Sequence, residues 1–168
     1  GISNEDGQSH QGLYDFAYLR HIPGMTVLAP ADEAELRLMI RKAHQMDSPC
    51  AIRYPKNVTV LPEGYVIEDF HIGKWLQLSK GTDAVLLATG SMTAAALRVA
   101  ELLSGKGVSL RVINASTIKP LDNALLAALL SENIPVFTLE EHVRAGGFGS
   151  AVLEFAADVP GNHDITLL

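Results

Sequence analysis

The fold of this chain is set by residues 84–113, which read AVLLATGSMTAAALRVAELLSGKGVSLRVI. Residues 84–89 are an apolar run that predicts a buried strand, and Gly90-Ser91 marks a turn. In residues 93–103 apolar side chains recur at helical spacing, so this segment is predicted to be a helix. Residues 108–113 predict the next strand. Strand, helix and strand in this order indicate a parallel sheet with a helical crossover.

The same alternation continues to the end of the chain. Residues 135–139 and 165–168 are predicted to be further strands. One helix is predicted before each of these strands. We therefore expect a doubly wound α/β domain over residues 72–168. The sequence ends at Leu168, within its last predicted strand. We therefore expect this domain to be truncated and the chain to be a segment of a longer polypeptide.

The first third of the chain does not account for a complete domain. Residues 25–29 and 50–54 are its two strand candidates, and a helix begins after Asp32, with Glu35 placed to complete a capping box. Two strands that are apolar on both faces would leave an open edge and an unburied face. Residues 1–58 are therefore predicted to be the C-terminal half of a parallel-sheet domain, followed by a linker over 59–71.

Composition excludes several classes of partner. The chain has 168 residues, 48% of them hydrophobic, and a net charge of −6, which argues against a nucleic-acid or anionic-membrane surface. It carries one cysteine, Cys50, which suits a reducing compartment. Membrane-spanning helices need about 20 apolar residues, and the sequence has no such run. We expect a cytoplasmic protein that binds neither nucleic acid nor membrane.

Three side chains are candidates for chemistry. Asp6 and His10 lie in an acidic, glycine-hinged loop, where an imidazole can hold or move a proton and a carboxylate can accept a hydrogen bond from a substrate hydroxyl. Arg53 follows a predicted strand, where parallel sheets place ligands, and a guanidinium can grip a phosphate. The alternatives are a plain turn with a capping Asp and a partly buried His, and a surface Arg that neutralises a nearby acid.

The glycine-rich turn at residues 146–150 has two interpretations. A turn before a helix can cradle phosphate on the helix amides. However, the glycine spacing is incomplete and Glu140 and Glu141 precede the turn, so a structural turn at a domain or subunit interface is favoured. The histidines and Cys50 show no metal-ligand spacing, so no metal ligand is predicted in this chain.

Several motifs together resemble one known family, the 1-deoxy-D-xylulose-5-phosphate synthases, which are thiamine-diphosphate enzymes related to transketolase. The resemblance spans nearly the whole chain and rests on Asp6-Gly7-Gln8-Ser9-His10-Gln11-Gly12, Ala29-Pro30-Ala31-Asp32-Glu33, Ile52-Arg53-Tyr54-Pro55, Lys119-Pro120-Leu121-Asp122 and Gly146-Gly147-Phe148-Gly149. One departure is Ser116-Thr117, where the family usually has Arg-Phe. It raises a question about local packing rather than catalysis.

The resemblance implies a synthase that condenses pyruvate with glyceraldehyde 3-phosphate, with loss of CO2, for isoprenoid precursor, thiamine and pyridoxal phosphate synthesis. It implies that residues 1–58 are the C-terminal half of a pyrimidine-binding, transketolase-like domain and that residues 72–168 are a transketolase C-terminal-like domain. It implies thiamine diphosphate and Mg²⁺ as cofactors, with their main ligands outside this chain. It also implies that His10 and Asp6 face the substrate as catalytic residues and that Arg53 binds the substrate phosphate. The implied partners are the N-terminal remainder of the same enzyme and a second copy in a homodimer, and this segment alone is expected to be inactive.

Two other functions stay open. One is a relative, either transketolase or the beta-type subunit of a 2-oxo-acid dehydrogenase. The other is a non-catalytic module, in which residues 71–168 serve for dimerisation or nucleotide binding.

Overall fold

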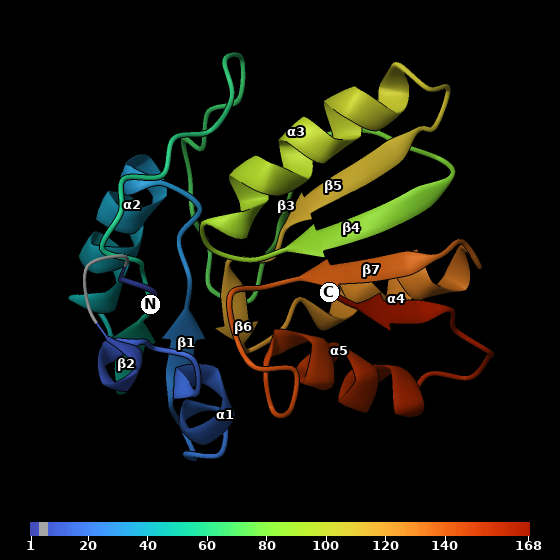
Figure 1. Cartoon of the computed structure of the whole chain (residues 1–168). Helices are drawn as coiled ribbons and strands as arrows, with labels where there is room; N and C mark the ends of the chain where they lie inside the picture. The colour runs from blue at the N-terminus through green and yellow to red at the C-terminus, as the bar shows by residue number, and fades with distance from the viewer. Residues whose placement is uncertain (4–6) are drawn as a thin grey trace.

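Two sheets organise the computed structural model, which describes residues 1–3 and 7–168 (Figure 1). The larger sheet has the spatial order β3 (Leu76–Gln77), β5 (Leu110–Asn114), β4 (Ala84–Ala88), β7 (Val136–Leu139) and β8 (Ile165–Leu167). The smaller sheet has the order β2 (Cys50–Ile52), β1 (Thr26–Leu28) and β6 (Thr117–Lys119). The helical elements are η1 (Gln8–His10), α1 (Asp15–Leu19), α2 (Glu33–Ala43), α3 (Met92–Ser104), α4 (Asn123–Ser131) and α5 (Phe148–Ala157).

The larger sheet is doubly wound, as the sequence predicts. Strands β5, β4, β7 and β8 are parallel, and β3 joins the β5 edge in the antiparallel sense. Helix α3 covers one face, and α4 and α5 cover the other (Figure 1). Alternate residues of β4 serve the two faces: Val85 and Leu87 belong to the core shared with α4 and α5, and Leu86 and Ala88 to the core shared with α3. Both faces are therefore buried, which explains the unbroken apolar run.

Strand β6 is a feature that the sequence did not reveal. After β5 the chain crosses to the smaller sheet, where β6 pairs with β1 in the antiparallel sense, Leu28 opposite Thr117. Strand β6 has only three residues and begins with a threonine, so no apolar pattern in the sequence indicates it. The unusual pair Ser116 and Thr117 lies at this crossing and is buried. The Ser116 carbonyl accepts from Ala29 N at 2.8 Å, and the Thr117 carbonyl accepts from Trp75 Nε1 at 2.9 Å.

Helix α2 begins as predicted, but its capping box is only half formed. The Asp32 side chain accepts a hydrogen bond from Glu35 N at 2.8 Å. The reciprocal bond from Asp32 N to Glu35 is replaced: the Glu35 carboxylate accepts from Ala31 N at 2.7 Å and from Asn114 Nδ2 at 2.9 Å. Asn114 lies at the end of β5, so the buried Glu35 side chain connects α2 to the larger sheet.

Two other expectations need correction. The helix expected over 11–19 is shorter, since α1 begins at Asp15. The predicted linker has no helix or strand between β2 and β3, yet it is packed, because Leu61 and Ile67 join the α3 core and Phe70 packs with Leu28 and Met39. Within the residues that the structure describes, no helix combines the length and apolar character needed to span a membrane.

Candidate active site

His10 is exposed to solvent at the end of the short turn η1. Its backbone N–H donates to the Gly7 carbonyl at 3.0 Å, and its Nδ1 lies 3.1 Å from the Ser9 hydroxyl. The predicted partner Asp6 lies outside the described residues, so the pairing of these two side chains stays a prediction. An exposed imidazole on a tight turn remains accessible to a substrate and can exchange a proton with it.

Arg53 occupies the predicted place, directly after β2, but its surroundings differ from an open phosphate site. Its side chain is 4% exposed. Nη2 donates to the carbonyls of Gly12, at 2.9 Å, and of Glu141. Nε donates to Asp15 Oδ2 at 3.4 Å, and Nη1 lies 3.8 Å from Glu141 Oε2. The guanidinium therefore sits in a buried cluster of protein acceptors, and a phosphate would have to replace at least one of them.

The structure adds a residue that the sequence reading left aside, His142. Its side chain is fully buried, and its ring stacks on Phe16 with the centroids 5.0 Å apart. Nδ1 donates to the Val143 carbonyl at 2.7 Å, and Nε2 accepts from Phe16 N at 3.1 Å. A carbonyl can only accept and an amide N–H can only donate, so these two contacts fit the tautomer that carries its hydrogen on Nδ1. Asp15 Oδ1, 3.6 Å from Nε2, shares the same Phe16 amide.

Only one signal in the sequence pointed toward His142. Like Arg53, it follows closely on a buried parallel strand, β7, whose carboxyl end faces the edge where ligands and functional side chains gather. Helix α1 supplies Asp15 and Phe16, so segments 126 residues apart meet here. The cluster brings Arg53 together with residues that no spacing rule connects.

The glycine-rich turn before α5 is structural. The Glu140 carboxylate accepts from Phe148 N at 2.7 Å and from Gly149 N at 2.8 Å, so it occupies the amides that a phosphate would use. A Cβ on Gly147 would lie 2.5 Å from Glu140 Oε2. Gly146 has φ +75°, and a Cβ there would lie 2.9 Å from the Ala17 side chain. Glycine at 146 and 147 therefore allows α1 and the carboxylate cap to approach closely.

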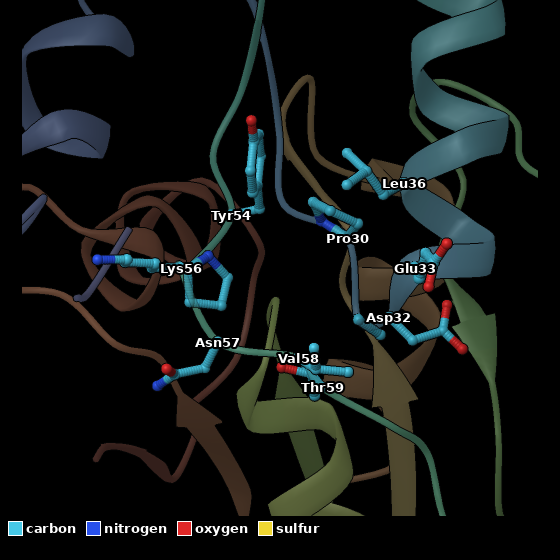
Figure 2. Close-up of a pocket in the computed structure, with 11 residues that line it drawn as sticks. Pro30, Asp32, Glu33, Leu36, Tyr54, Lys56, Asn57, Val58 and Thr59 are labelled. Carbon is cyan, nitrogen blue, oxygen red and sulfur yellow. The ribbon is translucent and has the colours of Figure 1, made fainter. Parts of the chain in front are cut away.

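A cavity of about 210 Å³ lies beside this cluster, at the carboxyl ends of β1 and β2 (Figure 2). Its lining is mainly apolar, with Asp32 and Glu33 on one side and the segment after Arg53 on the other. The lining residues are Pro30, Ala31, Asp32, Glu33, Leu36, Tyr54, Pro55, Lys56, Asn57, Val58 and Thr59. This volume is smaller than the about 300–1,000 Å³ of a typical pocket for a drug-sized ligand. Neither His10 nor Arg53 lines this cavity, so it adjoins the predicted site without containing it.

The described residues do not fit a complete thiamine diphosphate site. Among residues 1–3 and 7–168, no group of three or more His, Cys, Asp or Glu side chains is arranged to hold a metal ion. The amides at the start of α5, which could cradle a diphosphate, are filled by Glu140. Where the main cofactor ligands lie stays a prediction.

Comparisons with known proteins give the family. Residues 73–166 match the family described as transketolase, C-terminal domain, and residues 1–60 match transketolase, pyrimidine binding domain. The 1-deoxy-D-xylulose-5-phosphate synthase of Halalkalibacterium halodurans is 44% identical over 98% of this chain and 26% of its own length. The protein of that name from Prochlorococcus marinus is 45% identical over 94% of this chain and 25% of its own length.

A solved structure is similar over most of the chain. It is described as a split gene transketolase in an inactive β4 tetramer, and it superposes with a TM-score of 0.86 at 34% identity, over 95% of this chain and 52% of its own. This chain spans about a quarter of the length of the curated relatives that it matches. The C-terminal domain family alone matches more than half of the chain. The chain therefore belongs to the transketolase family.

Proposed function

We propose that this chain is part of a 1-deoxy-D-xylulose-5-phosphate synthase, which condenses pyruvate with glyceraldehyde 3-phosphate and releases CO2. The observation that carries the proposal is the 44% identity to a curated synthase over 98% of the chain, which includes the loop that bears Asp6 and His10. Transketolase is the nearer alternative, because the solved relative is a transketolase. The two reactions differ in the donor, since only the synthase decarboxylates pyruvate.

Thiamine diphosphate with Mg²⁺ would supply a carbanion able to attack a 2-oxo acid, which no side chain of this protein can supply. Its ligands would come from the N-terminal remainder of the same enzyme, and the active protein would be a cytoplasmic homodimer. The 168 residues alone would then bind the cofactor weakly and turn nothing over. Isothermal titration of the isolated chain with thiamine diphosphate and Mg²⁺ tests this, and micromolar binding or CO2 release would contradict it.

Within this chain, His10 would act at the aldehyde acceptor. Its exposed imidazole can protonate the oxygen that becomes a hydroxyl when the new carbon–carbon bond forms. Asp6 would orient the acceptor by accepting a hydrogen bond from a hydroxyl. The resemblance assigns the substrate phosphate to Arg53, a role that requires at least one of its N–H groups to leave a protein acceptor.

The test is CO2 release from labelled pyruvate by the complete enzyme, with and without glyceraldehyde 3-phosphate. Removing one acid–base group typically costs about 10²–10⁴-fold in rate, and we expect His10→Ala to fall in this range. His21→Ala is the matched control, because His21 is also exposed and lies in the same segment. An unchanged rate in His10→Ala would contradict the proposed site and favour the alternative in which this chain is a non-catalytic module. Turnover of ketose donors without pyruvate would point to transketolase instead.

A further inference from the structure

The start of helix α1 is held by two consecutive residues of the loop after β7. Phe16 N donates to His142 Nε2 at 3.1 Å, and Val143 N donates to the Leu13 carbonyl at 3.1 Å. Leu13 and Phe16 lie three and six residues after His10, so both contacts fall on the backbone that continues the His10 loop. The first of these bonds joins residues that are 126 positions apart in the chain.

The His142 side chain is fixed in this place by contacts on both ring nitrogens. It is fully buried, and its ring stacks on Phe16 at an interplanar angle of 15°. Nδ1 lies 2.7 Å from the Val143 carbonyl oxygen, which directs Nε2 toward the Phe16 amide. Phe16 N also lies 3.1 Å from Asp15 Oδ1, but this contact is made to the preceding residue and does not join α1 to another segment. The bond to His142 therefore connects α1 to the C-terminal part of the chain.

The C-terminal part also holds the other end of α1. Lys119 Nζ, from β6, donates to the carbonyls of Arg20 and Ile22 at 2.8 and 2.7 Å. The last carbonyls of a helix have no partner within the helix, so these bonds satisfy groups that α1 itself cannot pair. Arg20 Nη1 donates in turn to the carbonyls of Gly146 and Gly147 at 2.9 and 3.0 Å. Helix α1 has five residues, and isolated helices of fewer than about 12 residues are marginal in water, so its position depends on these contacts.

We propose that His142 is a positioning residue: through the Phe16 amide it fixes the start of α1, and thereby the His10 loop that leads into this helix. The C-terminal part of the chain would then orient a loop that lies more than a hundred residues earlier. The consequence for catalysis rests on the proposed function, but the tie between His142 and Phe16 does not.

Two variants separate positioning through the hydrogen bond from a packing role of the same ring. His142→Phe keeps an aromatic ring but has no acceptor, and His142→Gln keeps an acceptor but has no ring. Positioning through the hydrogen bond predicts that the Gln variant behaves like the wild type and that the Phe variant does not. A packing role predicts the reverse order.

The tie is tested first without any assay of activity, by hydrogen–deuterium exchange of the Phe16 amide in the intact protein. In His142→Phe we expect this amide to exchange about three- to tenfold faster, because it loses its acceptor in the loop after β7. In His142→Gln we expect exchange at the wild-type rate. His44→Phe is the matched control, because His44 is exposed at the end of α2.

Unchanged exchange in the folded His142→Phe protein would overturn the proposal. Equally fast exchange in both His142 variants would overturn it as well, since the ring and not the acceptor would then hold the helix. If His142→Phe does not fold, His142→Leu replaces it, because leucine also lacks an acceptor.

The catalytic consequence is tested on the complete enzyme by CO2 release from pyruvate, with glyceraldehyde 3-phosphate as the acceptor. A small misplacement of a catalytic group can cost about 100-fold, and we expect His142→Phe to lower kcat by about 10- to 100-fold. KM for glyceraldehyde 3-phosphate should stay within about twofold of the wild type, because a group that acts in the transition state changes kcat rather than KM. His142→Gln should restore most of kcat.

A normal kcat in His142→Phe, or a loss confined to KM, would overturn the positioning role. If the wild-type enzyme does not decarboxylate pyruvate with this acceptor, the proposed function falls, and the exchange experiment still decides the tie.

Discussion

Replacing Glu35 by alanine should destabilise the protein far more than replacing an exposed residue of α2. Glu35 is 2% exposed and bridges α2 to β5 through its two carboxylate oxygens. One oxygen accepts from Ala31 N and the other from Asn114 Nδ2, whose Oδ1 in turn accepts from the Thr93 hydroxyl. The substitution therefore leaves two buried donors without their acceptor.

The size of the effect follows from these two donors. An orphaned buried donor costs about 1–3 kcal/mol, so two of them predict a loss on the order of 2–6 kcal/mol. Removing the carboxylate also relieves the cost of burying a charge, which places our expectation near the lower half, about 3 kcal/mol. For a domain of this size, about 1 kcal/mol corresponds to 2–4 °C in Tm, so Tm should fall by roughly 6–12 °C.

Glu33→Ala is the matched control, because Glu33 lies in the same helical turn but is exposed and pairs with Arg37 across the surface. Surface pairs of this kind contribute about 0.3–0.5 kcal/mol, so this variant should melt within roughly 2 °C of the wild type. Glu35→Gln should lie between the two. Its amide keeps one acceptor oxygen for Ala31 N, and a flipped Asn114 side chain can accept from its NH2 group.

Thermal melts followed by circular dichroism, with urea titrations for the free energy of unfolding, measure all three variants. The reasoning would be refuted by a Glu35→Ala protein that melts with Glu33→Ala. It would also fail if Glu35→Gln were as unstable as Glu35→Ala, since the loss would then not come from unsatisfied donors.

Three further predictions concern the pH dependence of Glu35, the cap of α5 and the Cys50 thiol. Burial raises the pKa of Glu35, so its contribution favours the folded state below the ordinary glutamate pKa and is lost as pH rises through the raised folded pKa. The stability advantage of wild type over Glu35→Gln should therefore shrink in urea titrations as pH rises above the ordinary glutamate pKa, and a growing advantage would contradict this sign. Glu140→Ala should cost about 1–3 kcal/mol, because two amides at the start of α5 lose their acceptor, whereas exposed Glu68→Ala should be neutral in the same melts. Burial also raises the pKa of the Cys50 thiol, so alkylation at pH 7.5 should be slower than in the urea-unfolded chain, and equal rates in a mass-spectrometric time course would refute it.

The regular parts of the fold were predictable because their signals are local. The strand at Ala84–Ala88 and the helix that follows it lie in one contiguous stretch, and both are buried on the faces that the apolar pattern marks. Strand β6 was missed for the opposite reason. Three residues carry no period of their own, and their partner β1 lies about ninety residues earlier in the chain.

The candidate site was predictable in position but not in partners. Arg53 and Glu140 both follow parallel strands, and this place in the sequence predicts ligand binding. The same edge, however, is where backbone carbonyls and helix amides end without partners, and buried backbone groups must be satisfied. Arg53 donates hydrogen bonds to two such carbonyls, and Glu140 accepts hydrogen bonds from two such amides. The local sequence does not predict these contacts.

A polar side chain at the carboxyl end of a strand therefore has two possible roles, and burial separates them. Arg53, after β2, and Glu35, on α2, join the first third of the chain to its C-terminal part through buried partners, whereas Glu140 caps α5 within the C-terminal part. His10 is exposed. Its loop is followed by Leu13, whose carbonyl accepts a hydrogen bond from Val143 N in the C-terminal part of the chain. We therefore expect changes at Glu35 and Arg53 to lower the stability of the protein. A change at His10 should alter the reaction alone.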